Sequence, residues 1–213
     1  MVRTIAKDHD AKRRHILDVA AEVFAREGIA RASMNEVAKA CGISKANIYH
    51  YYASKDEVVF DILDSYLSEL RDRIRGLDFS TQPPAAQLHI LCREFLLAYE
   101  GMDHQHKIQS EGLPLLSLEQ QEILKDYQRD LVNAVSDVLR ECAPEVLSTN
   151  REECRNATMS VFGMVNWFYM WNPKADRKAR IAYAGSIANL TLNGIMGSAN
   201  AANNVEQLTE RAR

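Results

Sequence analysis

Apolar residues recur along the chain with the spacing of amphipathic helices and nowhere alternate as they would in a strand. In the first segment, Ile16, Ala20 and Phe24 fall at i, i+4 and i+8, which places them on one face of a helix. The pattern predicts helices at residues 11–27, 33–40, 44–51, 54–76, 84–100, 103–111, 117–142, 150–171 and 176–197. We therefore expect an all-α fold of about nine helices.

Turn and capping residues mark where these helices begin and end. Gly28 follows the first helix, where a glycine can adopt the left-handed conformation that stops it. Ser33 and Glu36 have the spacing of a capping box at the start of the second helix. Gln82-Pro83-Pro84 is the strongest interruption of the helical pattern. We expect a small N-terminal domain of residues 11–72 and a larger helical domain of residues 73–213.

The second and third predicted helices have the spacing of a helix-turn-helix motif, because a turn of about three residues around Gly42 separates them. In this motif the second helix enters the major groove of DNA while the first braces it. Its outward side chains are short or form hydrogen bonds, as a base-reading surface requires. They are Lys45, Ala46, Asn47, His50 and Tyr51. Asn47 can pair with adenine, and Lys45 can reach guanine or a phosphate.

The distribution of charge agrees with DNA binding better than the net charge of -3 does. Residues 1–55 hold ten basic and six acidic residues, a balance of +4, and the remainder holds 16 basic and 23 acidic residues, a balance of -7. A basic head attracts phosphates, while an acidic body avoids wrapping onto the duplex. A constitutive DNA-packaging protein would need basic charge over far more of its surface.

Mean hydropathy is -0.30, and no stretch approaches the ~20 apolar residues that span a bilayer. The polar N-terminus shows no signal-peptide pattern. We therefore expect a protein that stays in the cytoplasm and has no membrane partner.

The residues of enzymes and metal sites have no recognisable arrangement here. The cysteines, Cys41, Cys92, Cys142 and Cys154, form no C-x-x-C pair, which favours reduced, mostly buried thiols and no metal ligands. No H-E-x-x-H, G-x-S-x-G or phosphate-binding glycine loop occurs. We expect no catalytic residues and no cofactor. The enzymatic alternative is a hydrolase built around Cys92 and His89.

Two stretches closely resemble the TetR family of repressors. They are ILDVAAEVFAREG at residues 16–28 and MNEVAKACGISKANIYHYYASKDE at residues 34–57, and the resemblance covers about residues 11–72. It implies that Tyr49 and Lys55 contact phosphates and that Lys45, Ala46, Asn47 and His50 face the bases. Ser33 and Ser44 stand at helix N-termini, where hydroxyls and free amides meet phosphate.

The same resemblance implies that the last two long helices form a four-helix bundle with a second subunit, so that the protein is a homodimer on a double-stranded DNA operator. Small and aliphatic residues line one face of the last helix, which permits close helix packing. They are Ile181, Ala184, Ala188, Leu192 and Ile195. The alternative is that this face belongs to the core of its own chain.

The run Gly-Met-x-Asn-Trp-x-x-x-Trp at residues 163–171, followed by Pro173, resembles a subgroup of TetR regulators that control fatty-acid, aromatic-acid and sterol breakdown. Regulators of that subgroup respond to acyl-coenzyme A thioesters. Alternatively, Trp167 and Trp171 belong to the bundle core.

Candidate effector-binding residues combine apolar walls with a few polar groups, as small-molecule sites do. They are His89, Cys92, Phe95, Tyr99, Gln109, Tyr127, Asn166, Trp167, Met170 and Trp171. Arg93, Arg129 and Arg155 are candidates for contact with a nucleotide phosphate. We expect a repressor that binds a palindromic operator and is released from it by a small-molecule effector. The effector that the resemblance favours is an acyl-CoA thioester. The alternative effector is a hydrophobic drug, with an efflux pump as the regulated gene.

Overall fold

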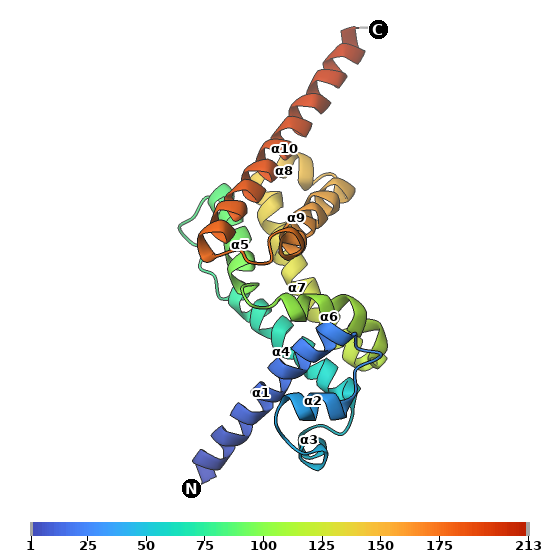
Figure 1. The fold of residues 1–213 in the computed structure, drawn as a ribbon. Helices are drawn as coiled ribbons and strands as arrows, with labels where there is room; N and C mark the ends of the chain where they lie inside the picture. Colours follow the sequence, from blue (N-terminus) through green and yellow to red (C-terminus); the bar gives the residue numbers. More distant parts are fainter. Residues whose placement is uncertain (1, 212–213) are drawn as a thin grey trace. The chain divides into compact units, whose positions relative to one another are not determined.

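The structure is a computed structural model that describes the backbone of residues 2–211 and the side chains of residues 9–195 and 197. Every regular element in this described part is helical (Figure 1), which confirms the all-α prediction. The elements are α1 (Val2–Glu27), α2 (Met34–Ala40), α3 (Lys45–Tyr51), α4 (Lys55–Arg75), α5 (Pro84–Ala98), α6 (Asp103–Gly112), the 3-10 helix η1 (Leu113–Leu115), α7 (Leu118–Cys142), α8 (Pro144–Leu147), α9 (Arg151–Trp171) and α10 (Arg177–Arg211). None of the helices searched in the described part is long and apolar enough to cross a membrane.

The chain forms two compact units. The N-terminal unit consists of the residues up to Glu69 together with Gly101–Gln128, and the C-terminal unit consists of Leu70–Glu100 together with the residues from Arg129 onward. Helices α4 and α7 each contribute to both units. The N-terminal unit therefore includes α6, which the sequence analysis assigned to the C-terminal domain.

A glycine at the end of α6 allows this helix to pack closely on the N-terminal helices. A Cβ atom on Gly112 would lie 2.9 Å from Cγ1 of Val59 and 3.1 Å from Cδ1 of Ile29. The ammonium group of Lys107 donates to the carbonyl of Ala25, which is one of the orphan acceptors at the C-terminal end of α1. Helix α6 thus packs closely on α4 and on the segment after α1, and it is hydrogen-bonded to the end of α1.

The predicted helix ends are confirmed where capping chemistry defines them. Gly28 has a φ of 82° directly after α1, and Gly42 has a φ of 68° in the turn between α2 and α3. Ser33 and Glu36 form the expected capping box. The helix α8 was not expected, since the pattern predicts no helix between residues 142 and 150, and it begins at Pro144. Proline also fits the first turn of a helix, where its missing N–H costs nothing.

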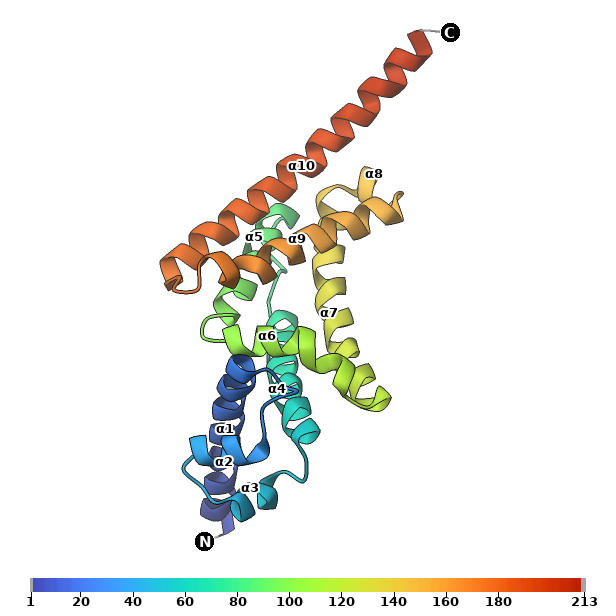
Figure 2. The ribbon, with the colours of Figure 1, turned by 45° about the vertical axis from the view of Figure 1, so that its right-hand side comes forward.

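In the C-terminal unit, α10 runs alongside α5 and α9 (Figures 1 and 2). Ala184, Ile187 and Ala188 are buried on its inner face. Their mostly small side chains allow the helices to approach closely. The aliphatic core of the unit thus forms around the first half of α10.

Arg180 is buried near the start of α10, at 3% exposure. Its guanidinium donates to the carbonyl of Leu96 at 3.2 Å and to that of Ala175 at 3.3 Å. It also lies over the ring of Phe168, 5.7 Å from the centroid. The Leu96 carbonyl belongs to the last turn of α5, where no intrahelical donor is available. Arg180 therefore links α10 to the C-terminal end of α5.

We expect Arg180→Met to lower the free energy of unfolding by about 1–3 kcal/mol, because two carbonyl acceptors lose their donor in a buried place. Arg177→Met is the matched control, since Arg177 is exposed on the same helix. Thermal unfolding followed by circular dichroism measures both. Equal melting temperatures for the two variants would show that the guanidinium does not join these helices.

Candidate nucleic-acid interface and effector region

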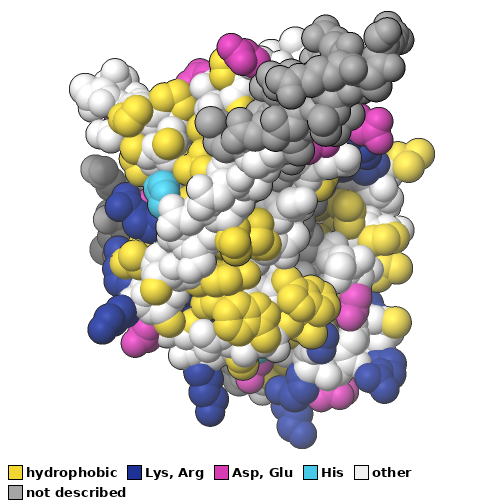
Figure 3. Space-filling model, turned by 90° about the horizontal axis from the view of Figure 1, so that it is seen from above, with side chains coloured by type: hydrophobic (Ala, Val, Ile, Leu, Met, Phe, Trp, Pro, Cys, Tyr) yellow, Lys and Arg dark blue, Asp and Glu magenta, His cyan; other side chains and the backbone are white. Residues whose placement is uncertain are grey.

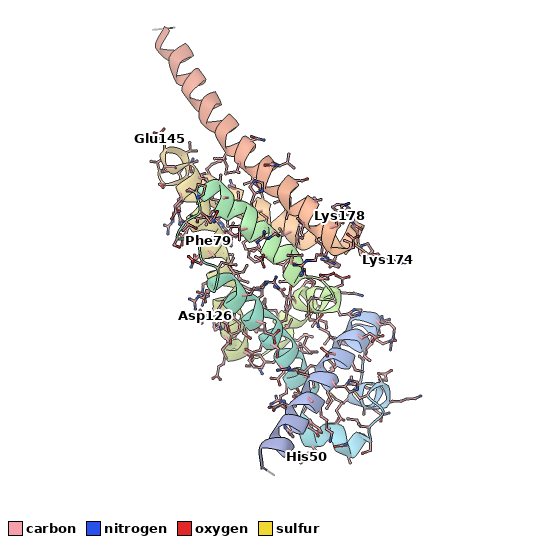
Figure 4. The ribbon with its side chains drawn as sticks, turned by 90° about the vertical axis from the view of Figure 1, so that its left-hand side faces the viewer. His50, Phe79, Asp126, Glu145, Lys174 and Lys178 are labelled. Atoms are coloured by element: carbon pink, nitrogen blue, oxygen red, sulfur yellow. The ribbon has the colours of Figure 1, made fainter. Side chains whose placement is uncertain are left out.

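Helix α3 presents a polar surface on an apolar anchor. Its N-cap is Ser44, whose Oγ accepts from the backbone N–H of Asn47 at 3.1 Å. Ile48 is fully buried beneath the helix. The outward side chains are exposed, as expected: Lys45, Ala46, Asn47, Tyr49 and His50. Figure 4 shows His50 on α3, at the edge of the N-terminal unit. This arrangement can place hydrogen-bonding groups in a groove of DNA.

Tyr52 fixes the C-terminal end of α3. Its ring is buried at 1% exposure, and burial raises the pKa of its hydroxyl. The guanidinium of Arg13 on α1 donates to this hydroxyl at 3.3 Å and also pairs with Asp61 on α4. Sequence reasoning missed Arg13, because its two partners lie 39 and 48 positions away and no local pattern connects them.

Tyr51 is oriented differently from its neighbours on α3. Its ring lies 5.0 Å from that of His9 on α1 and 5.6 Å from that of His50. The side chain is half-buried in these contacts. Tyr51 therefore packs between α1 and α3 as well as bordering the exposed surface.

Lys55, for which the family resemblance implies a phosphate contact, bonds within the protein in this structure. Its ammonium donates to the carbonyls of Ile29 at 2.7 Å, Ala32 at 3.1 Å and Ala30 at 3.3 Å. An ammonium group has three protons to donate, so these bonds engage all of them. Lys55 holds the loop between α1 and α2, and thereby positions α2.

Ser33 is likewise engaged within the protein. Its hydroxyl and its backbone N–H both donate to the Glu36 carboxylate, at 2.8 and 2.7 Å. These hydrogen bonds lower the pKa of Glu36, which keeps the carboxylate charged. A negative charge at this helix end disfavours a phosphate there. Ser44 has no such carboxylate at its cap and is the better candidate for a phosphate contact.

The ten effector candidates are divided between the two units. Gln109 and Tyr127 belong to the N-terminal unit, and the other eight belong to the C-terminal unit. The hydroxyl of Tyr127 donates to Asp64 at 3.0 Å, also in the N-terminal unit. His89 on α5 is half-buried.

Buried candidates meet at the contact of α5 with α9. Tyr99 donates to Oδ1 of Asn166 at 2.9 Å, and its burial raises the pKa of its hydroxyl. Phe95 packs edge-on against Phe162, with 5.4 Å between the ring centroids. Burial raises the pKa of the Cys92 thiol to about 12, so this cysteine stays protonated at neutral pH. Cys92, Phe95 and Tyr99 are buried, Phe162 is half-buried and Asn166 is exposed, so the polar pair lies at the border of this core.

The remaining candidates lie on an open face. Trp167, Met170 and Trp171 are 60%, 52% and 55% exposed. The Trp171 ring packs edge-on against Phe168 and Tyr183. Both tryptophans therefore lie outside the core of the single chain, and the alternative that they belong to the core of a bundle with a second subunit stays a prediction.

The residues proposed for the dimer contact lie mostly inside the chain. Ala184 and Ala188 are 1% and 0% exposed, and Ile195 is 7% exposed. Leu192 is half-buried, and only Ile181 is open, at 43%. A helical stripe of small residues can pack against a helix of its own chain or against one of a second subunit. Here α5 of the same chain covers it. The interpretation of this stripe as an exposed dimer face needs correction.

Each unit contains a cavity. A cavity of about 320 Å³ lies among α1, α4 and α6 in the N-terminal unit. A larger one, of about 700 Å³, lies between α7 and α9 in the C-terminal unit. None of the ten effector candidates lines either of these two cavities. Among the described residues, no group of three His, Cys, Asp or Glu side chains is placed to hold a metal ion.

Comparisons with known proteins agree with this fold. The profile described as bacterial regulatory proteins, tetR family, matches residues 16–62. The profile described as tetracyclin repressor-like, C-terminal domain, matches residues 81–195. The HTH-type transcriptional repressor KstR2 of Mycobacterium tuberculosis (strain CDC 1551 / Oshkosh) is 31% identical over 102 residues, which are 48% of this chain and 50% of KstR2. The chain thus matches about half the length of this curated relative.

Solved structures extend the likeness over most of the chain. A TetR-family transcriptional regulator from Bordetella parapertussis 12822 is 31% identical, with a TM-score of 0.77, covering 84% of this chain and 93% of that one. FadR from Bacillus subtilis, solved in complex with stearoyl-CoA, shares the fold at 19% identity, with a TM-score of 0.65 and coverage of 85% and 98%. The chain belongs to the TetR family of bacterial regulatory proteins.

Proposed function

We propose that this chain is a ligand-responsive transcriptional repressor, which binds a palindromic DNA operator as a homodimer and leaves it when a small molecule binds. The observation that carries this proposal is the exposed polar face of α3, held on the buried Ile48 and Tyr52, in a chain of this family. The protein acts where the chromosome is, in the cytoplasm, and it is not an enzyme.

Side chains of this surface make two kinds of contact with DNA, to base edges and to phosphates. Asn47 and Lys45 read base edges, because an amide and an ammonium can bond to adenine and guanine in the major groove. Tyr49 and Ser44 bind phosphates and set the position of the helix without reading sequence. Lys55 and Arg13 act behind the surface, by holding the loop and the end of α3.

The partner subunit covers the open face of α9. Gly163, Trp167 and Met170 follow one another at helical spacing, and all are exposed. They lie opposite the buried face that includes Val161 and Val165. Apolar side chains also gather into a patch on the surface in Figure 3. A contiguous apolar patch of this kind marks an interaction site. Dimerisation thus relies on α9, with Ile181 on α10 at the margin.

An acyl-CoA thioester is the effector that the sequence favours. The Asn166-Trp167 segment carries the resemblance, and FadR, which has the same fold, was solved with stearoyl-CoA. The buried Tyr99 and the exposed Asn166 form a polar pair at the border of an aromatic core, which offers a hydrogen-bonding group to a ligand. A hydrophobic drug is the alternative effector. The genes next to this one distinguish the two effectors. Acyl-CoA ligase and dehydrogenase genes would support the acyl-CoA thioester, and a transporter gene would support the drug.

Base reading and phosphate binding have different signatures. Asn47→Ala is expected to relax preference at one base pair, by about 1–3 kcal/mol. Tyr49→Phe, which removes only the hydroxyl, is expected to weaken binding to operator and random DNA by the same factor. Fluorescence anisotropy with both DNAs measures these effects. Identical behaviour of the two variants would refute this division of roles.

Lys55→Met separates positioning from phosphate contact. The loop carbonyls lose their donors, so we expect a lower melting temperature together with weaker binding to all DNA. The salt dependence should stay unchanged, because no phosphate contact is lost. A fall of about one in the slope of log affinity against log salt, at unchanged stability, would instead show a direct phosphate contact.

Met170→Glu tests the dimer face. A charge in the middle of an apolar contact is expected to dissociate the dimer and abolish operator binding. Leu118→Glu is the matched control, since Leu118 is 80% exposed on α7 in the N-terminal unit. Light scattering gives the mass of each variant. A Met170→Glu dimer as stable as the wild type would place the contact elsewhere.

A further inference from the structure

The larger cavity has no role in the function proposed so far. It has a volume of about 700 Å³ and lies between α7 and the first half of α9. Asn133, Ser136 and Arg140 line it from α7, and Arg151, Arg155 and Thr158 line it from α9. Its size falls within the range of cofactor and ligand sites.

Positive charge dominates the lining. Three arginines border the cavity, and Glu152 is the one acidic residue of the lining. Arg140 pairs with Asp137 at 2.8 Å. Within the described part of the chain, neither Arg151 nor Arg155 forms an ion pair. The two stand one helical turn apart on α9, where like charges repel each other.

Helix α9 adds to the positive potential. It begins at Arg151, after the N-cap Asn150, so that its N-terminal end borders the cavity. The aligned peptide dipoles of a helix favour an anion at this end. An arginine presents a planar fork of donors that matches the oxygens of a phosphate. The cavity thus has the chemistry of a site for a phosphorylated ligand.

The inner wall of the cavity contains polar side chains that internal hydrogen bonds hold in place. Ser136 and Thr158 are buried at 7% and 1% exposure. The Thr158 hydroxyl donates to the carbonyl of Cys154 at 2.7 Å, and Ser136 lies 3.4 Å from the sulfur of Cys154. A ligand therefore meets a preformed wall there, while the exposed Arg151 and Arg155 guanidinium groups can adjust to it.

We propose that this cavity binds the phosphate-bearing nucleotide of the coenzyme A thioester, an inference that rests on the acyl-CoA effector proposed above. The distance along α9 agrees with the length of the pantetheine arm of coenzyme A. Arg155 and Asn166 are eleven residues apart on α9, which is ~16 Å along a helix. The arm has about thirteen bonds between its sulfur and the first phosphorus, and an extended chain advances ~3.3–3.6 Å per three bonds, so that it reaches about this far. A thioester bound near Asn166 therefore leaves its nucleotide at the arginines.

The experiment compares three ligands by isothermal titration calorimetry: an acyl-CoA, the N-acetylcysteamine thioester of the same acid, and adenosine 3′,5′-bisphosphate. The acyl-CoA is expected to bind the wild-type chain at least tenfold more tightly than the N-acetylcysteamine thioester. Arg155→Ala and Arg151→Ala should each remove about tenfold of acyl-CoA affinity and leave the other thioester unchanged. Loss of a charged hydrogen bond has this magnitude.

Arg177→Ala is the matched control. Arg177 is exposed on α10 and lines neither cavity. It should bind all three ligands as the wild type does. Melting curves of the three arginine variants show that each is folded.

Two failures have different signatures. If both thioesters bind alike and Arg155→Ala and Arg151→Ala change neither affinity, the cavity is not the nucleotide site, while the proposed effector stands. If no thioester binds or releases the operator, the acyl-CoA effector fails. Adenosine 3′,5′-bisphosphate then tests whether the cavity binds a nucleotide at all. If it binds the wild type and Arg155→Ala abolishes this binding, the cavity remains a nucleotide site. If it binds the wild type and Arg155→Ala equally, or binds neither, the nucleotide site is overturned.

Discussion

A helix of seven residues is too short to persist in water, because isolated helices below ~12–15 residues are marginal. The reading helix α3 therefore depends on what it buries. Ile48 and Tyr52 supply the apolar anchor, and Arg13 joins Tyr52 to α4 through Asp61. This anchoring leaves Asn47 and Tyr49 exposed in fixed positions. Base reading depends on this fixed orientation of the exposed side chains.

The same anchoring extends to α6. Gly112 lets α6 approach Val59 and Ile29, and Lys107 bonds to the end of α1. Because α4 and α7 contribute to both units, a change in the C-terminal unit can reach the reading head along continuous helices. A ligand that binds the released state better than the DNA-bound state shifts the equilibrium by its differential affinity alone. A coupling of about 1.4 kcal/mol releases the operator tenfold.

Local chemistry was predictable from the sequence, and long-range partners were not. The capping box of Ser33 and the left-handed Gly28 need only neighbouring residues, and both were confirmed. Lys55 matches a family position, but its carbonyl partners lie 23 to 26 residues away. The stripe of Ala184 and Ala188 has the same spacing whichever chain covers it. Periodicity identifies an apolar face, and only the fold identifies its partner.

Operator binding by a dimer can be measured by selecting bound sequences from a random double-stranded DNA pool and then determining the mass of the selected complex. We expect an enriched palindrome bound by two chains, with half-sites about 34–36 Å apart, one turn of the duplex. Enrichment should disappear in the Asn47→Ala, Tyr49→Ala double variant. A pool without enrichment, or a single asymmetric half-site bound by one chain, would refute palindromic binding by a homodimer.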